Sequence, residues 1–159
     1  SPATLIAAGE LLKLGVDISA MTRRLYRTQP MNRVKLTRIA YNKLRFMFDG
    51  QVGVIDFDKH DFEETGCTFW QADGLVNKAL EVEGVRMAVL ASEREDGIKM
   101  SLRAVEPDTV NDIAVLFGGG GHAQAAGCTI HAPLYEALDQ VLAAMKDKLD
   151  KTPRPESRA

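Results

Sequence analysis

Four consecutive glycines, Gly118 to Gly121, constrain the fold of this chain more than any other feature. They are followed by His122 and then by small residues, in the order LFGGGGHAQAAG. Glycine loses more backbone entropy on folding than any other residue, so a run of four inside a globular chain needs a physical reason. Gly118 alone could end a preceding helix, which leaves three glycines unexplained. The run therefore indicates that something approaches this backbone so closely that side chains are excluded.

Two interpretations of the glycine run stay open from spacing alone. Successive glycines allow backbone N–H groups to converge into an anion-binding concavity, and the His122 ring could donate a further hydrogen bond to a phosphate or a ribose oxygen. The same residues are also compatible with a flexible connecting turn. A Walker loop is excluded, because no Gly-Lys-Ser/Thr sequence follows the glycines.

The chain after Gly50 has the pattern of a mixed α/β domain. Residues 98–105 alternate, with apolar side chains on one face and Lys99, Ser101 and Arg103 on the other, which predicts a half-buried strand. An apolar run at 85–91 and a polar turn at 93–97 predict that this strand belongs to an antiparallel hairpin. Further strands are expected over 51–57 and 127–131, and helices over 58–65, 69–80, 107–117 and 133–149. We expect an α/β fold with a mixed β-sheet and flanking helices.

The first 50 residues are predicted to form a helical connector, because their helices are short and no strand pattern accompanies them. Helices are expected over 2–14, 17–26 and 32–48. Residues 18–48 contain no acidic side chain and carry these basic ones: Arg23, Arg24, Arg27, Arg33, Lys35, Arg38, Lys43 and Arg45. Such a block can attract phosphates. We favour the alternative that it is a solvated helix face, or a face that packs against an acidic neighbouring domain.

The cysteine content and the ends of the chain indicate its cellular compartment and its relation to a longer protein. Cys67 and Cys128 form no CxxC pair, which favours a reducing cytoplasm, and both are interpreted as small apolar residues. No run of residues approaches the length of a membrane span. The chain begins Ser-Pro without an initiator Met and is interpreted as an internal part of a longer protein. Residues 151–159 are polar and contain prolines, so we expect disorder there.

Two other groups of residues have both a chemical and a structural interpretation. Asp56, Asp58, His60 and Asp61 gather carboxylates around a histidine, which could suggest metal ligation. We favour a helix start with solvated carboxylates for this cluster. Trp70 could be a platform on which a base stacks. Its place at the first turn of an amphipathic helix predicts that it belongs to the core.

The segment SLRAVEPDTVNDIAVLFGGGGHAQAAG, residues 101–127, resembles the signature of the domain attached C-terminally to the DHH-family phosphoesterases. In that family, a catalytic domain with an Asp-His-His motif is followed by a smaller domain. The smaller domain carries a Ser-Leu-Arg-Ser strand, a helix, and a Gly-Gly-Gly-His loop that leads into Ala-Ala-Gly. Residues 73–90 are most similar to the short nano-RNase branch of the family.

This resemblance implies a division of the chain into three parts. Residues 1–49 correspond to the end of the catalytic domain and the helical interdomain linker. Residues 50–150 correspond to the DHH-associated, substrate-binding domain, and residues 151–159 to a disordered tail.

The resemblance also implies a substrate site. Its residues are Ser101, Arg103, Gly118, Gly119, Gly120, Gly121 and His122. The glycines and His122 match the loop that holds the substrate nucleotide, and Ser101 and Arg103 match the strand that contacts its phosphate or base. Ala104 stands where the family often has a second serine, which we expect to tune these contacts without abolishing binding.

The activity implied by the resemblance belongs to the full-length parent. That parent is expected to be a manganese-dependent phosphoesterase that hydrolyses short oligonucleotides, 3′-phosphoadenosine 5′-phosphate, or both. Its two manganese ions are held by aspartates and histidines of the catalytic domain, so this chain is expected to contain no catalytic or metal-binding residue and to be inactive alone. The expected ligands are short oligonucleotides or phosphoadenosine-type nucleotides, and the expected protein partner is the chain's own catalytic domain. No membrane partner is expected. Whether the protein forms a homodimer stays open.

Other contexts for the same domain stay open. The parent could be a RecJ-like exonuclease or a cyclic-dinucleotide phosphodiesterase, although the Ala-Ala-Gly ending at 125–127 and the short connector favour the nano-RNase branch. The domain could also be an interaction module whose glycine loop is structural, but Ser101, Arg103 and His122 speak against that. Alanyl-tRNA synthetases carry a similar domain, and the helical connector argues against that setting.

Overall fold

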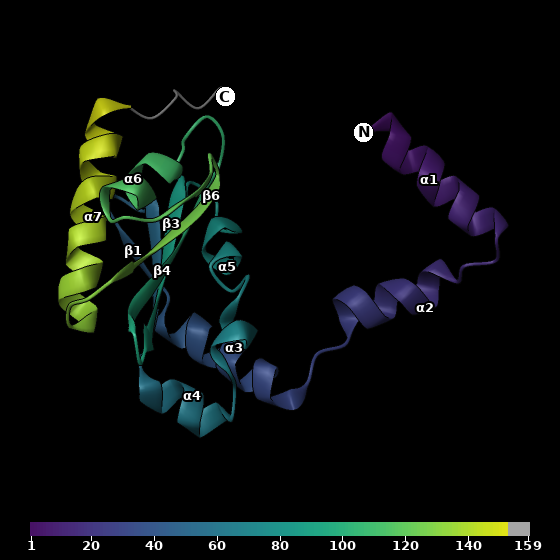
Figure 1. The fold of residues 1–159 in the computed structure, drawn as a ribbon, viewed down its shortest axis with the longest axis horizontal. Coiled ribbons are helices and arrows are strands. Elements are labelled where there is room, and N and C mark those ends of the chain that lie inside the picture. The colour runs from purple at the N-terminus through teal and green to yellow at the C-terminus, as the bar shows by residue number, and fades with distance from the viewer. Residues whose placement is uncertain (153–159) are drawn as a thin grey trace.

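A six-stranded β-sheet with the strand order β1-β2-β3-β4-β6-β5 lies at the centre of the structure, a computed structural model that describes residues 1–152 (Figure 1). Its strands are β1 (Arg45–Met47), β2 (Val52–Phe57), β3 (Met87–Arg94), β4 (Gly97–Ala104), β5 (Gly120–His122) and β6 (Ala125–Ile130). β2 and β3 pair parallel, whereas the other neighbours pair antiparallel. The predicted mixed sheet and the hairpin around residue 95 are therefore confirmed.

Helices cover both faces of the sheet (Figure 1). One face carries α6 (Asn111–Leu116) and α7 (Leu134–Lys151). The other face carries α3 (Met31–Lys43), α4 (Lys59–Thr65) and α5 (Asn77–Leu80), with the 3₁₀ turn η2 (Phe69–Ala72) between the last two. Two separate cores result, one on each side of the sheet, as the predicted α/β fold requires.

Strand β4 separates a buried face from a polar one, as its alternating sequence predicts. Met100 and Leu102 are fully buried against the α6 and α7 layer. Lys99, Ser101 and Arg103 point the other way and are half-buried. On that second face, the helices α3 to α5 pack on β2 and β3, and the core there does not extend to β4 or β6. The polar side of β4 is therefore left outside both cores.

The N-terminal segment stands off from the sheet and its helices (Figure 1). It contains α1 (Pro2–Lys13), α2 (Ile18–Thr22) and the π-helical turn η1 (Arg23–Arg27). None of these elements has a buried residue. The predicted helices over 2–14 and 17–26 are thus present, although the second continues as a π-helical turn. Among the described residues, no helix combines the length and the apolar character needed to cross a membrane.

The helix predicted over 32–48 ends earlier than expected. α3 stops at Lys43, and Arg45–Met47 forms β1, which pairs antiparallel with β2. The Arg45 guanidinium forms an ion pair with the buried Asp56 carboxylate of β2. β1 therefore takes the place of the last predicted helical turn. As a strand, these residues form backbone hydrogen bonds with β2, which they could not form as the end of a helix.

The single helix predicted over 69–80 is wrong, because the segment breaks at Gly74. This glycine has a φ of 83°, which a continuous helix does not allow. Arg33 of α3 donates hydrogen bonds to the carbonyl oxygens of Gln71 and Asp73, which holds the chain open at the break. Trp70 is 73% exposed, so its predicted place in the core is also wrong.

A buried ion pair fixes the segment between β4 and α6. Arg86 donates from Nη2 to Asp108 Oδ1 at 2.7 Å and from Nε to Oδ2 at 2.8 Å, and both side chains are almost fully buried. Arg86 also donates to Gln51 Oε1 and to the Thr152 carbonyl oxygen. Because this arginine holds the Asp108 carboxylate, the helix predicted from Pro107-Asp108 begins only after Val110, at Asn111.

The remaining local predictions are confirmed. Asp58 caps α4 through a capping box, and Gly66 ends that helix with a φ of 65°. The strands expected at 51–57 and 127–131 and the helix at 133–149 are present. Of the tail predicted to be disordered, Lys151 belongs to α7, and residues 153–159 lie outside the described residues.

Replacing Asp108 with Asn is expected to lower the free energy of unfolding by about 3–5 kcal/mol, because the Arg86 guanidinium would stay buried without its counter-charge. Guanidinium chloride unfolding measures the difference. Asp150→Asn is the matched control, since it removes an exposed pair with Lys146 and should cost less than about 1 kcal/mol. Equal losses in the two variants would contradict a structural role for the buried pair.

Candidate functional site

The strand register brings the side chains of the predicted site onto one face of the sheet. β4, β6 and β5 are successive neighbours, and directly opposed residues of antiparallel strands point to the same side. One row across the three strands consists of Arg103, Ala125 and His122, and the next consists of Ser101, Gly127 and Gly120. We call this surface, which lies outside the apolar core under α3 to α5 and is bordered by α5, the site face. Four predicted site residues, Ser101, Arg103, Gly120 and His122, lie on it.

Three of the four glycines are required by the fold itself. Gly118 follows the end of α6 with a φ of 71°, as the predicted C-terminal glycine of a helix. A Cβ on Gly119 would lie 2.6 Å from Cys128 Cβ, and one on Gly121 would lie 2.5 Å from the Ala125 carbonyl oxygen. Gly119 and Gly121 therefore allow β5 to lie directly against β6.

Gly120 is the exception in the run. Its φ is not positive, and a Cβ built on it would meet nothing within 4 Å. It faces the site face together with Ser101 and Gly127. The contacts within the described chain therefore do not require a glycine at this position, unlike at Gly118, Gly119 and Gly121.

The glycine run is held rigidly in place. Gly119 N–H donates to the Ala114 carbonyl oxygen at 2.9 Å, and the turn after β5 accepts hydrogen bonds from two other segments. The Val110 N–H donates to the Ala123 carbonyl oxygen at 2.7 Å, and the Ala104 N–H donates to the Gln124 carbonyl oxygen at 3.1 Å. Residues 120–122 therefore form a short edge strand, where the alternative interpretation had a connecting turn.

The side chains of the site face carry positive charge and hydrogen-bond donors. Arg103 donates from Nη1 to the neighbouring Leu102 carbonyl oxygen at 2.9 Å, and within residues 1–152 no carboxylate lies in ion-pair range of it. His122 is exposed, and the Ser101 hydroxyl lies one row away. A guanidinium, a hydroxyl and an imidazole above bare backbone can bind an anionic oxygen group.

Gly127 is a part of the site face that the sequence did not assign to the site. A Cβ on this residue would lie 2.7 Å from the Met100 carbonyl oxygen, so only glycine allows β6 to pair closely with β4 here. It lies between Ser101 and Gly120 in one row of the site face, and the Lys99 side chain lies over it. The signal for it was the Ala-Ala-Gly ending, which the sequence placed in a strand without a role.

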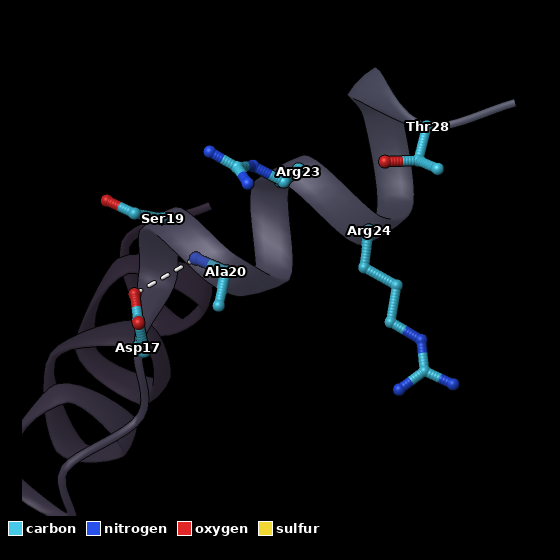
Figure 2. Close-up of a pocket in the computed structure, with 6 residues that line it drawn as sticks. All are labelled: Asp17, Ser19, Ala20, Arg23, Arg24 and Thr28. Carbon is cyan, nitrogen blue, oxygen red and sulfur yellow. Dashed lines mark hydrogen bonds between the residues drawn. The ribbon is translucent and has the colours of Figure 1, made fainter.

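A second candidate location, on the linker, does not form a convergent site. A hollow of about 460 Å³ is lined by Asp17, Ser19, Ala20, Arg23, Arg24 and Thr28. Figure 2 shows that the side chains of Arg23 and Arg24 point away from each other. Asp17 caps α2, because its carboxylate accepts a hydrogen bond from the Ala20 N–H at 2.9 Å. These arginines therefore do not gather around one ligand position.

The basic block of the linker and α3 is only partly a solvated face. Lys43 donates to Asp61 Oδ2 at 2.6 Å and lies 3.4 Å from Asp58 Oδ2, and Arg45 pairs with Asp56. Although burial opposes it, the hydrogen bond and the charge of Asp61 raise the pKa of Lys43. These basic side chains stabilise the domain through acidic partners in the same chain.

The cluster of carboxylates around His60 is the start of α4, as predicted, but its carboxylates are not all solvated. Asp56 and Asp61 are buried in their ion pairs with Arg45 and Lys43. Within residues 1–152, no group of three or more His, Cys, Asp or Glu side chains is arranged to hold a metal ion. The cluster therefore has a structural explanation.

Both cysteines are buried, which agrees with their interpretation as small apolar residues. Cys128 lies on the buried side of β6, and burial raises the pKa of its thiol. A thiol with a raised pKa is mostly protonated and is a poor nucleophile. Neither cysteine adds a reactive group to the site face.

Comparison with known proteins identifies relatives of this domain. A family model described as the DHHA1 domain matches residues 49–151. The chain is 32% identical over 152 residues to the bifunctional oligoribonuclease and PAP phosphatase NrnA of Thermus thermophilus, and the match covers 95% of this chain and 45% of that protein. It is 30% identical over 143 residues to the NrnA of Bacillus subtilis, where the match covers 90% and 44%.

A solved structure shares the fold over nearly the whole chain. It is an exopolyphosphatase-related protein from Bacteroides fragilis, which superposes with a TM-score of 0.86 at 25% identity and covers 95% of this chain and 44% of that one. The chain thus spans less than half the length of the curated relatives it matches.

A pair of glycine substitutions tests the arrangement of the site face. Gly119→Ala is expected to destabilise the fold by about 1–3 kcal/mol, because its Cβ would press into the backbone of β6. Gly120→Ala, one residue away, should change stability by less than about 1 kcal/mol, because its Cβ would point into open space. Thermal unfolding of the two variants separates these effects. If Gly120→Ala were the more destabilising variant, the register of β5 would be incorrect.

Proposed function

The chain belongs to the DHHA1 domain family, and on that premise we propose that it is the substrate-binding domain of a DHH-family phosphoesterase. The proposed substrates are short oligonucleotides, 3′-phosphoadenosine 5′-phosphate, or both. The observation that carries the proposal is the gathering of Ser101, Arg103, Gly120 and His122 on one uncovered sheet face. The names of the two NrnA relatives favour these substrates over the cyclic dinucleotides of a related branch.

The chemistry of the site face suits a nucleotide phosphate. The planar Arg103 guanidinium can donate two parallel hydrogen bonds to phosphate oxygens, and it has no carboxylate partner within the described chain that would compete. The Ser101 hydroxyl and a His122 ring nitrogen can donate to further phosphate or ribose oxygens. Gly120 allows the nucleotide to approach the backbone directly, because nothing in the described chain lies within 4 Å of the position of its Cβ.

The N-terminal part is proposed to be the end of the catalytic domain and the interdomain linker, residues 1–49, followed by the substrate-binding domain over 50–150. Support comes from the helix α1, whose apolar side chains have no core of their own. The exposed ones in and just after this helix are Leu5, Ile6, Leu11, Leu12 and Leu14. A segment of this kind needs a further partner to bury it, and the NrnA relatives are about twice as long as this chain.

The metal ions of the proposed reaction are assigned to the catalytic domain. Two manganese ions there would activate a water molecule and stabilise the leaving oxygen of the phosphoester. The described residues of this chain form no group that fits such ions, so no step through a metal is assigned to them. The proposed role of this domain is to hold and orient the substrate. We place the parent protein in the cytoplasm, because its two cysteines here are unpaired.

Isothermal titration with 3′-phosphoadenosine 5′-phosphate tests the proposed binding. The chain is expected to bind it weakly, because the catalytic domain would supply the other half of the site. Arg103→Ala should weaken binding by about 1.5–3 kcal/mol, the usual contribution of a hydrogen bond to a charged group. Arg24→Ala removes an arginine of the linker as a control and should leave the affinity unchanged. Equal affinities of the Arg103 variant and the parent chain would remove Arg103 from the site.

Turnover is expected only with the catalytic domain present. With manganese added, this chain alone should not hydrolyse a 5′-labelled dinucleotide, because the proposed metal ligands belong to the catalytic domain. A longer chain that includes that domain should do so, and its Arg103→Ala variant should have only a small part of the rate. If the short chain hydrolysed the dinucleotide, and this activity copurified with it through a second column, the proposal that hydrolysis needs the catalytic domain would be contradicted.

A further inference from the structure

Lys99 is a cation of the site face that neither the sequence nor the comparisons assign. It lies on the same side of β4 as Ser101 and Arg103. Its Nζ atom lies 3.3 Å, and its Cε atom 3.6 Å, from the position that a Cβ on Gly127 would occupy. The lysine side chain is therefore folded over Gly127, in the row that also contains Ser101 and Gly120.

The charge of Lys99 is not neutralised within the described part of the chain. No carboxylate there lies within ion-pair distance of its Nζ, although other lysines of the domain, such as Lys43 and Lys148, are paired. Opposite Lys99 on the neighbouring strands lie Ser92 and Thr129, which are uncharged. A half-buried ammonium held over bare backbone without a counter-charge is suited to an anionic ligand.

We propose that Lys99 and Arg103 bind two different phosphates of one substrate, those on either side of a single ribose. This proposal rests on the function proposed above and deepens it. Arg103 occupies one row of the site face, and the Lys99 ammonium lies over the next. Alternate residues of a strand are separated by roughly 6–7 Å, which is comparable to the spacing of consecutive phosphates along a nucleic acid strand.

The proposed pair of cations explains how one surface takes two kinds of substrate. 3′-phosphoadenosine 5′-phosphate carries phosphates on both sides of its ribose, and so does the 5′-phosphorylated end of an oligonucleotide. A nucleoside with one phosphate would engage only one of the two cations. The recognised unit is therefore a nucleoside 3′,5′-bisphosphate, whether free or at the end of a strand.

Titration with three nucleotides tests this assignment: adenosine 3′,5′-bisphosphate, adenosine 5′-monophosphate and adenosine 3′-monophosphate. The parent chain should bind the bisphosphate most tightly. Lys99→Met removes the charge and keeps the length of the side chain. It should weaken bisphosphate binding roughly tenfold or more, to near the level of the better monophosphate, while affinity for that monophosphate changes less than about threefold.

Four further measurements separate ligand binding from a structural role. Lys99→Arg keeps the charge and should retain the preference for the bisphosphate. Lys35→Met removes an exposed lysine of α3 and should change neither affinity nor salt dependence. For Lys99→Met, the slope of log affinity against log salt for the bisphosphate should fall by about 0.7, because the protein would neutralise one phosphate fewer. The thermal unfolding midpoint of all three variants should stay close to that of the parent chain.

The outcomes distinguish this inference from the proposed function. If Lys99→Met binds all three nucleotides like the parent chain while Arg103→Met weakens each of them, Lys99 is not a phosphate ligand and the proposed function stands. If Arg103→Met also changes nothing, or the parent chain binds none of the nucleotides at millimolar concentration, the proposed function fails together with the role of Lys99. If Lys99→Met loses the preference for the bisphosphate while Lys99→Arg and Lys35→Met keep it, the result supports the proposal that Lys99 and Arg103 bind two different phosphates.

Discussion

The site face depends on the absence of three β-carbons, at Gly119, Gly121 and Gly127. At each of these positions a Cβ would press into backbone or Cβ atoms of the neighbouring strand, so no rotamer change elsewhere could relieve the contact. Because the strands pair so closely, the register that places His122 in the row of Arg103 is maintained. If β5 were displaced from β6, the two ends of the site would separate.

The location of the site follows from an uneven coverage of the sheet. The layer formed by α6 and α7 packs against the buried side of β4 and β6, whereas the layer formed by α3 to α5 packs mainly on β2 and β3 and reaches β4 only through α5. The side chains of the candidate site therefore lie beside the edge of a helix layer. Met100 and Leu102, fully buried on the reverse side of the same strand, hold Lys99, Ser101 and Arg103 in position. A site on a rigid strand loses little entropy when a ligand binds.

The basic side chains of this domain differ in whether they have an acidic partner. Arg45, Lys43 and Arg86 each have a buried acidic partner, and these pairs join β1, α4 and the segment before α6 to the rest of the domain. Arg103 has no such partner within residues 1–152, and it remains partly hydrated on the open face. A cation that already pairs with a carboxylate inside the fold would have to break that ion pair to bind a phosphate. A cation without such a partner can bind a phosphate without this cost.

Local patterns in the sequence determined much of this protein. The period-two alternation of β4, the caps at Asp58 and Gly66 and the helix end at Gly118 depend on neighbouring residues alone, and the structure has them where the sequence predicts them. The types of residue on the site face could also be named in advance. The alternation already placed Ser101 and Arg103 on one face, but that Gly120 and His122 share this face was not visible in the sequence, because it depends on the register of three strands.

Tertiary structure decided the features that depend on partners distant in the chain. The end of α3 is determined by pairing of β1 with β2, and the break at Gly74 is held open by Arg33 from α3. The same holds for the burial of Asp56, whose ion partner lies on another strand. Among the glycines, the sequence could not distinguish Gly119, which meets β6, from Gly120, which meets open space. The physical reason is that a glycine's neighbour across the sheet is specified by strand pairing, and local sequence does not encode that pairing.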